Sequence, residues 1–287
     1  MKYLVCVLWV SALLIDSVKA QPLPKPNTFA PKLTLLWETD ALLTTVESVI
    51  YDPVSKHIYT TNINGHFMKK DGNGFISKVD LQGKIVESHW VKGLDAPTGT
   101  GISQGKLYVT DIDKLIAIDI AQGKILKTYA IKGAKALNDV EVGKDGTVYC
   151  SDTGGNQIFA LKNGKITCVV PKIDTPNGLL ADGDRFLVTC WTPKTLNYLD
   201  LNTKKITSIS NGLTGPDGIE KVDDQHYLVS GFKGLIHLVN KNGQKQLLLD
   251  TQDQKINATD IDYIPSMKIL LVPTFSKNTI RAYKLTY

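Results

Sequence analysis

The sequence contains little of what several functional classes require. It has 4 cysteines and 5 histidines, without the CxxC spacing of a zinc or redox site and without an i, i+4 histidine pair. No Gly-x-Ser-x-Gly motif is present, so a serine-nucleophile mechanism has no support. The formal net charge of +5 is spread along the chain, which argues against a nucleic-acid partner, because such proteins carry a clustered basic surface.

Long hydrophobic runs are equally scarce, and only the run from Leu4 to Ile15 has the composition of a targeting segment. It follows Lys2 and precedes Val18-Lys19-Ala20, whose small residues suit a signal peptidase. We expect residues 1–20 to be a signal peptide cleaved after Ala20, because this run is too short to span a bilayer of about 30 Å. A retained membrane anchor is the alternative. Cleavage would give an exported protein, periplasmic or secreted, without a membrane partner.

Cysteine usage leaves the redox state open. Removal of Cys6 with the signal would leave Cys150, Cys168 and Cys190, all within apolar runs where cysteine behaves as a small hydrophobe. One disulfide can form among them in an oxidising compartment, and the sequence does not select the pair.

The rest of the chain is dominated by a repeat. Residues 21–31 are proline-rich and aperiodic, which indicates an extended leader, and Lys32 to Glu38 has the pattern of a lone strand. From Val46 onward a polar motif followed by apolar runs recurs in six copies, spaced by 51, 40, 39, 40 and 42 residues. A period near forty with four strands per copy is typical of a β-propeller blade. The equivalent polar residues of the copies, the marked positions, are Glu47, Thr98, Asn138, Asn177, Asp217 and Thr259.

Turn chemistry and the chain ends complete the fold prediction. Tight-turn pairs such as Gln82-Gly83 and Asn163-Gly164 lie between the third and fourth runs of a copy. The last copy ends at Tyr287 after three runs, and the strand from Lys32 to Glu38 supplies the fourth. We therefore predict an all-β, six-bladed β-propeller over residues 32–287, with four antiparallel strands per blade and the N-terminal strand closing the ring in the last blade. An open two-sheet sandwich is the rival, although it would not need six evenly spaced copies.

A propeller brings the marked positions together, because the first strand of every blade lines the central channel. Two carboxylates and two carboxamides make an oxygen-only set that suits Ca²⁺ or another hard divalent cation. The alternative is local, since Pro-Asn-Gly and Pro-Asp-Gly are common turn sequences. Glu47 has no such turn preference, and its neighbours have the pattern of a strand.

The chain resembles the gluconolactonase and senescence-marker-protein-30 family of six-bladed propellers over nearly the whole mature length. The resemblance rests on Glu47 in the first inner strand, Asn138-Asp139 in the third, Pro176-Asn177-Gly178-Leu179 in the fourth and Pro216-Asp217-Gly218-Ile219 in the fifth. It implies that Glu47, Asn177 and Asp217 hold one divalent metal ion, for which we favour Ca²⁺ over Zn²⁺, Mg²⁺ or Mn²⁺. It also implies lactone hydrolysis, for which Asp217 is the candidate catalytic base, with Asn138 facing the substrate. We add Thr98 and Thr259, at the same position of copies two and six, as substrate-binding candidates.

Two departures from the family pattern concern the substrate. Sugar-lactone hydrolases of the family carry an Arg just before the third-blade Asn, where this chain has Ala136 and Leu137. The usual Gly-Glu-Gly-Pro is replaced by Val46-Glu47-Ser48-Val49. The expected partner is a small lactone or related ester acted on by a monomer. The alternatives are a non-catalytic propeller that binds a ligand or protein around a structural metal, and a strictosidine-synthase-like or arylesterase-like propeller.

Several further features have two interpretations. The insertion from Asn64 to Gly74 could cover the channel as a lid or be a plain surface loop. Asp111 and Asp152, which end second strands, could line the mouth, although turn chemistry is the simpler account. Aromatic residues after or beside the strands could shape an apolar pocket or pack between blades, and these are Phe67, Trp90, Trp191 and Phe232.

Overall fold

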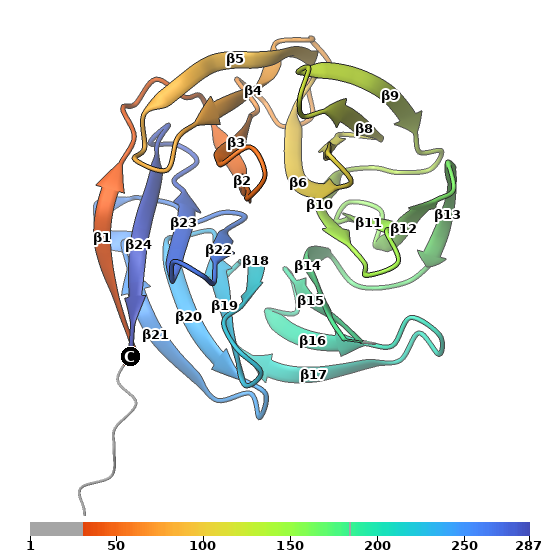
Figure 1. The fold of residues 1–287 in the computed structure, drawn as a ribbon. Helices are drawn as coiled ribbons and strands as arrows, with labels where there is room; N and C mark the ends of the chain where they lie inside the picture. Colours follow the sequence, from red (N-terminus) through yellow and green to blue (C-terminus); the bar gives the residue numbers. More distant parts are fainter. Residues whose placement is uncertain (1–30, 184) are drawn as a thin grey trace, which may run out of the picture. The chain divides into compact units, whose positions relative to one another are not determined.

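Six antiparallel sheets of four strands each are arranged in a ring in the computed structural model, which describes residues 31–183 and 185–287 (Figure 1). Each sheet is one blade, and in the first five blades the strands follow one another from the axis outward in chain order. The predicted six-bladed β-propeller is therefore confirmed. The expected signal peptide, and the expected leader apart from Pro31, lie outside the described residues.

The first three blades comprise strands β2 to β13. Their bounds are β2 Val46–Asp52, β3 His57–Asn62, β4 Gly74–Val79, β5 Ile85–Leu94, β6 Pro97–Ser103, β7 Lys106–Asp111, β8 Lys114–Asp119, β9 Lys124–Ala130, β10 Leu137–Val142, β11 Val148–Asp152, β12 Gln157–Lys162 and β13 Lys165–Val170.

The fourth and fifth blades comprise β14 to β21, and the last contains β22 to β24. Their bounds are β14 Pro176–Asp182, β15 Arg185–Cys190, β16 Thr195–Leu199, β17 Ile206–Asn211, β18 Pro216–Lys221, β19 His226–Gly231, β20 Leu235–Asn240, β21 Lys245–Asp250, β22 Asp262–Ile264, β23 Ile269–Pro273 and β24 Ile280–Thr286. The helical element in the described residues is one 3-10 turn, η1 Gln252–Gln254. None of the described helical structure is long and apolar enough to cross a membrane.

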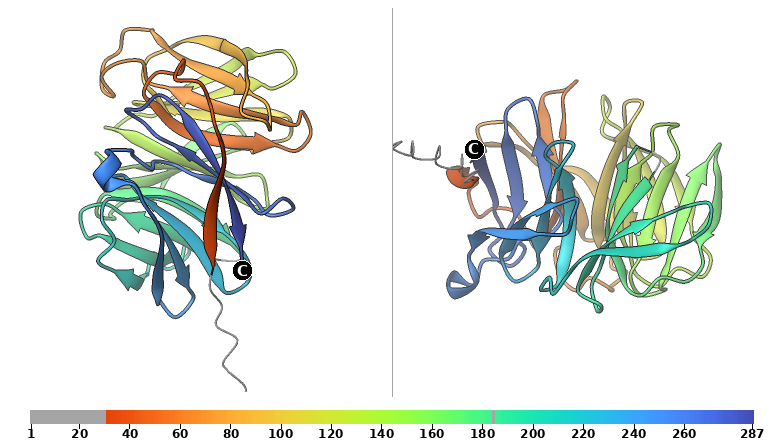
Figure 2. Two further views of the ribbon diagram at one scale, coloured as in Figure 1. Left: turned by 90° about the vertical axis from the view of Figure 1, so that its left-hand side faces the viewer. Right: turned by 90° about the horizontal axis from the view of Figure 1, so that it is seen from below.

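The ring closes between the two ends of the described chain. Strand β1 (Lys32–Glu38) pairs antiparallel with β24, so the last blade has the order β1-β24-β23-β22. Figure 2 shows β1 running beside β24 at the outer edge of that blade. Glu38 adds an ion pair of 3.0 Å with Arg281 of β24. The predicted closure by an N-terminal strand is confirmed, and it pairs an edge that would otherwise be exposed.

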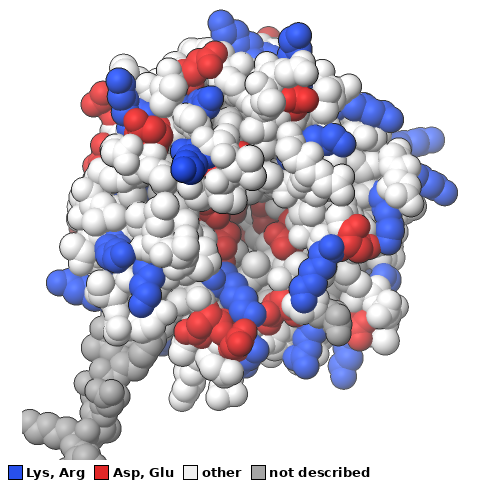
Figure 3. All heavy atoms as spheres, viewed as in Figure 1, with Lys and Arg blue, Asp and Glu red and all other residues white. Residues whose placement is uncertain are grey.

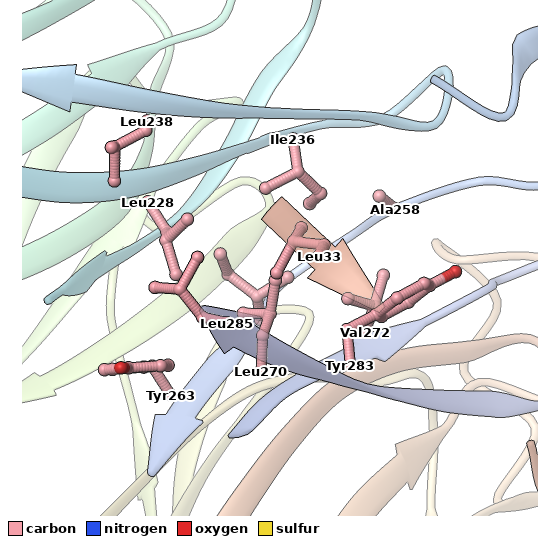
Figure 4. Close-up of a cluster of buried hydrophobic side chains, with 11 residues drawn as sticks. Leu33, Leu228, Ile236, Leu238, Ala258, Tyr263, Leu270, Val272, Tyr283 and Leu285 are labelled. Atoms are coloured by element: carbon pink, nitrogen blue, oxygen red, sulfur yellow. The ribbon is translucent and has the colours of Figure 1, made fainter. Parts of the chain in front are cut away.

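Hydrophobic packing lies between neighbouring blades. Six clusters of buried side chains join the blades in turn around the ring. Figure 4 shows the cluster between the fifth and last blades, where Leu228 and Ile236 pack with Leu270 and Leu285, and Leu33 of β1 belongs to the same cluster. A fully buried leucine or isoleucine contributes about 1.5–3 kcal/mol. The fold is therefore stabilised chiefly by blade-to-blade contacts that require the complete ring.

The insertion between β3 and β4 is bonded to the second blade. Lys70 makes an ion pair of 2.5 Å with Asp113, and the backbone N–H of Gly72 donates to Asp95 at 3.0 Å. Phe67 in the same insertion is 55% exposed. These contacts attach the insertion to the loop before the inner strand β6 and to the turn between β7 and β8, and its role as a lid stays a prediction.

Candidate metal centre

Five of the six marked positions lie in strands, each beside a β-bulge. In five blades the register between the first and second strands shifts around the marked residue, as between Pro176 and Leu179 and between Pro216 and Ile219. The Pro-Asn-Gly and Pro-Asp-Gly segments are therefore bulged strand starts, which aim a side chain out of the regular ladder. The local-turn alternative is wrong for Asn177 and Asp217.

Thr259 occupies the equivalent place in the last blade, although strand β22 begins only at Asp262. The segment around Thr259 forms hydrogen bonds with the first blade instead. The backbone N–H of Asp260 donates to the Glu47 carbonyl at 3.1 Å, and Asp260 forms a parallel bridge with Ser48. The segment that precedes β22 is therefore bonded directly to the inner strand of the first blade.

Hydroxyl groups on the second strands hold the inner bulges in place. Thr189 donates to the Asp217 carbonyl at 2.7 Å, and Ser230 donates to the Thr259 carbonyl at 2.6 Å. Each bond runs from one blade to the marked residue of the next blade. The orientation of each marked side chain is thus fixed by its neighbouring blade as well as by its own.

Glycine after the marked residue lets adjacent inner strands approach closely. A Cβ on Gly178 would overlap the backbone carbonyl of Asp217, and a Cβ on Gly218 would lie 2.6 Å from the backbone nitrogen of Ile261. Side chains cannot be accommodated at these distances, so glycine is required for the packing of the inner strands. This close approach brings Asn177 and Asp217 together at the axis.

Five of the six marked side chains have a buried oxygen without a hydrogen-bond partner. These oxygens are Glu47 Oε2, Asn138 Oδ1, Asn177 Oδ1, Asp217 Oδ1 and Thr259 Oγ1. Only two other side-chain atoms of the described residues, Thr44 Oγ1 and Arg281 Nε, share this property. An unpaired buried polar atom costs about 1–3 kcal/mol, so its repetition at equivalent positions requires an explanation.

Thr98 differs from the other five. Its hydroxyl contacts Thr110 Oγ1 at 2.9 Å and the carbonyl of Asn138 at 3.1 Å, so it is already used inside the protein. Asn138 differs in another way, because its residue is partly exposed whereas the other marked residues are buried.

Burial and mutual repulsion act on both marked carboxylates. Burial raises the pKa of Glu47 well above its usual range, and the charges of Asp217 and Asp139 add to the shift. Burial and the charge of Asp139 raise the pKa of Asp217 to about 8, while a hydrogen bond from Asn177 acts in the opposite direction. The two carboxylates are close enough to repel each other, and a bound cation would remove that repulsion.

The chemistry of this set fits a hard divalent cation. Glu47, Asn177 and Asp217 supply carboxylate and carboxamide oxygens, each with an unpaired lone pair in a buried setting. Among residues 31–183 and 185–287 there is no cluster of three or more His, Cys, Asp or Glu side chains arranged for a metal. A cation here would therefore depend on the Asn177 amide oxygen in addition to the two carboxylates.

Two further buried carboxylates, missed by the sequence reasoning, lie directly beside this set. Asp139 accepts from the backbone N–H of Leu179 at 2.6 Å, and Asp260 accepts from the Ser48 hydroxyl at 2.6 Å. Burial raises the pKa of Asp139 to about 6 and that of Asp260 well above its usual range. Both residues follow a marked position at the place where the second, fourth and fifth blades have glycine, and that difference was the available signal.

A third group of carboxylates lies three residues after the marked position in the third, fifth and last blades. These are Glu141, Glu220 and Asp262, and with Asp139 and Asp260 they line a cavity of about 930 Å³. None of the six marked residues lines this cavity, which opens at the opposite ends of the inner strands. Figure 3 shows the hollow at the centre of the ring, with acidic side chains in its wall.

Other sequence candidates have structural roles. Asp111 accepts the backbone N–H groups of Asp95 and Ala96, and Asp152 accepts that of Ala136, so both fix the loop that enters an inner strand. Cys150, Cys168 and Cys190 are unpaired, with Cys150 and Cys190 buried. No disulfide therefore joins the described cysteines.

Comparison with family models gives no match, and comparison with curated proteins gives none either. Solved structures are similar in fold. They include a candidate gluconolactonase at 14% identity and a TM-score of 0.66, covering 90% of this chain and 93% of the other. Virginiamycin B lyase from Staphylococcus aureus follows at 17% identity and a TM-score of 0.64, covering 90% of this chain and 100% of the other. A streptogramin B lyase matches at 14% identity and a TM-score of 0.63, covering 90% of this chain and 98% of the other. At these identities the likeness shows a shared fold.

Proposed function

We propose that the protein is a metal-dependent hydrolase that opens a lactone or related ester at the marked positions, where the inner strands of the blades begin. The observation that carries this proposal is the set of five unpaired buried oxygens at equivalent positions of five blades. The resemblance to gluconolactonases supports the reaction class. The neighbours named gluconolactonase and virginiamycin B lyase agree with an enzymatic role for this fold.

Glu47, Asn177 and Asp217 would hold the cation, and Ca²⁺ fits them best. All three offer oxygen ligands, which Ca²⁺ accepts in flexible geometry, whereas Zn²⁺ favours nitrogen and sulfur. Two carboxylates would balance the charge of a divalent ion. A cation bound there would polarise the ester carbonyl as a Lewis acid.

The chain's own residues would perform the remaining steps. Asp217 would hold the cation through its unpaired Oδ1 and accept a proton from the attacking water through its second carboxylate oxygen. The water oxygen forms a bond to the acyl carbon, the bond from that carbon to the ring oxygen breaks, and the ring oxygen takes up the proton. Asn138, which is partly exposed beside the buried set, would contact the substrate.

A matched pair of variants tests the proposal. Asp217→Asn removes one charge and the base, so lactone hydrolysis should fall at least about a hundredfold, with a loss of bound metal. Asp145→Asn is the control, because that carboxylate is exposed and pairs with Lys162 on the surface. Hydrolysis is followed with a pH indicator on a panel of small lactones, and metal content is measured on the same samples. Unchanged hydrolysis and metal content in Asp217→Asn would refute the proposal.

The same experiment separates the enzyme from a binding protein. Metal that is bound by the unaltered protein and lost in Asp217→Asn, without turnover of any lactone, would show that the site is structural. That result would support a non-catalytic propeller and overturn the hydrolase.

A further inference from the structure

Three aromatic rings form a row at the end of the ring that carries the marked positions. Trp191, Phe232 and Phe275 come just after the second strands of the fourth, fifth and last blades. The ring centroids of Trp191 and Phe232 are 5.7 Å apart, and those of Phe232 and Phe275 are 5.2 Å apart, both in edge-to-face geometry. The three residues, here called the aromatic row, therefore form one continuous surface across three blades.

The aromatic row is joined by backbone contacts to the candidate metal ligands. The N–H of Trp191 donates to the Thr175 carbonyl at 2.9 Å, two residues before Asn177. The N–H of Phe232 donates to the Gly215 carbonyl at 2.8 Å, two residues before Asp217. Phe275 forms a bridge with Val46, which precedes Glu47. Each ring thus stands at the entrance to the strand that carries one of the three ligands.

Solvent exposure distinguishes the aromatic row from the residues that follow the second strands of the first two blades. The three rings are partly exposed, whereas Ile63 and Ile112, which follow the second strands of the first two blades, are 2% and 4% exposed. Ile63 and Ile112 pack against Phe275 instead of facing solvent. The accessible apolar surface beside the oxygen set is therefore aromatic and confined to one side.

Two polar side chains that contact the backbone beside the aromatic row, those of Asn257 and Thr153, are already used within the protein. Asn257 donates its amide to the Phe232 carbonyl at 2.9 Å and accepts from Ser276 at 2.5 Å. Thr153, at the corresponding place in the third blade, donates to the Pro176 carbonyl at 2.6 Å. A sugar ring would need free hydrogen-bonding groups here, and these residues do not supply them.

We propose that the aromatic row binds a flat apolar group of the substrate, so that the preferred substrate is an aryl-fused or aryl-substituted lactone and not a sugar lactone. This inference rests on the proposed function. Aromatic faces and edges favour stacked or edge-to-face contact with another ring. The short connection from each ring to a candidate ligand would place the ester group of such a substrate beside the oxygen set.

The first test measures binding with ketones, which cannot be hydrolysed. Tetralone has an aromatic ring fused to a cyclic ketone, and cyclohexanone is the matched ketone without it. Calorimetry on the intact protein should show tighter binding of tetralone, weakened about three- to tenfold in Trp191→Leu and in Phe232→Leu. Tyr287→Leu is the control, because Tyr287 is an exposed aromatic that follows β24, outside the aromatic row and outside the insertion. Equal binding of the two ketones, or tetralone binding unaffected by both row variants, would overturn the inference.

The second test compares turnover of dihydrocoumarin, valerolactone and gluconolactone. We expect kcat/KM to be highest for dihydrocoumarin and to fall in the row variants for that substrate alone, with metal content unchanged. A preference for gluconolactone would overturn the substrate class and leave the hydrolase standing. Absence of turnover of all three lactones would refute the hydrolase, and the ketone measurements would still decide whether the aromatic row binds flat rings.

Discussion

At the scale of single residues, six equivalent backbone positions carry different chemistry. Glu47, Asn177 and Asp217 leave oxygens unpaired at the axis, whereas Thr98 in the same position bonds within the protein. The convergence of these side chains was predictable, because a repeat places equivalent residues around one axis. Which hydroxyl would be satisfied internally was not predictable, because that depends on side chains of the neighbouring blade.

The environment of each thiol leads to a prediction about its reactivity. Burial raises the pKa of Cys190 to about 12 and that of Cys150 still further, whereas Cys168 is exposed. In a chain beginning at Gln21, a thiol reagent near pH 8 should modify Cys168 alone until denaturant is added, because the thiolate is the reactive form. Cys168→Ser should abolish reaction with the native protein. Rapid modification of Cys150 or Cys190 in the native state would contradict the burial described here.

At the scale of elements, the strand pattern and the tight turns were correctly predicted, and the bulges were not. A local reading of Pro-Asn-Gly favours a turn, because Asn and Gly suit turn geometry. The bulge at Asn177 arises from bonds to other strands, including the bond from Leu179 to Asp139 of the preceding blade. Such bonds join residues 40 positions apart, so a local pattern cannot reveal them.

The close approach of the inner strands predicts the effect of Gly178→Ala. The added methyl group would overlap the Asp217 carbonyl, so we expect a loss of about 1–3 kcal/mol in the free energy of unfolding and weaker cation binding. Gly105→Ala is the contrast, because it faces open space at a φ of 72° and should cost about 1 kcal/mol of backbone strain alone. Denaturant unfolding and cation titration of both variants check this. Cation binding weakened equally in both would argue against a specific effect on Asp217.

At the scale of the whole molecule, the channel contains seven carboxylates, and burial raises the pKa of each of them. The pKa values of Asp217 and Glu141 reach about 8, that of Asp262 about 7 and that of Asp139 about 6, with Glu47, Glu220 and Asp260 also raised. The repeat predicted a channel, and it did not predict this concentration of charge, because only one position per copy was compared.

These shifts determine how stability depends on pH without a metal. Between about pH 4 and pH 8 the folded protein holds protons on these groups that the unfolded chain has released, so stability falls as pH rises through that window. In chelator, the free energy of unfolding should be larger near pH 5 than near pH 8. Added Ca²⁺ should stabilise the protein more at the higher pH, where the carboxylates need no proton.

The control for this pH dependence is Glu141→Gln. It retains the acceptor for the Ala181 N–H and removes one titrating group, so it should flatten the profile. Stability in chelator that rises from pH 5 to pH 8 would contradict the assignment of protonated carboxylates to the channel.

Calorimetric titration of Ca²⁺ into chelator-treated protein tests the central claim most directly. The account predicts one Ca²⁺ per chain, at least about tenfold weaker binding in Glu47→Gln and in Asp217→Asn, and unchanged binding in Asp145→Asn. Absence of binding by Ca²⁺, Mg²⁺, Mn²⁺ and Zn²⁺, or Ca²⁺ binding of equal strength in Glu47→Gln, would contradict it.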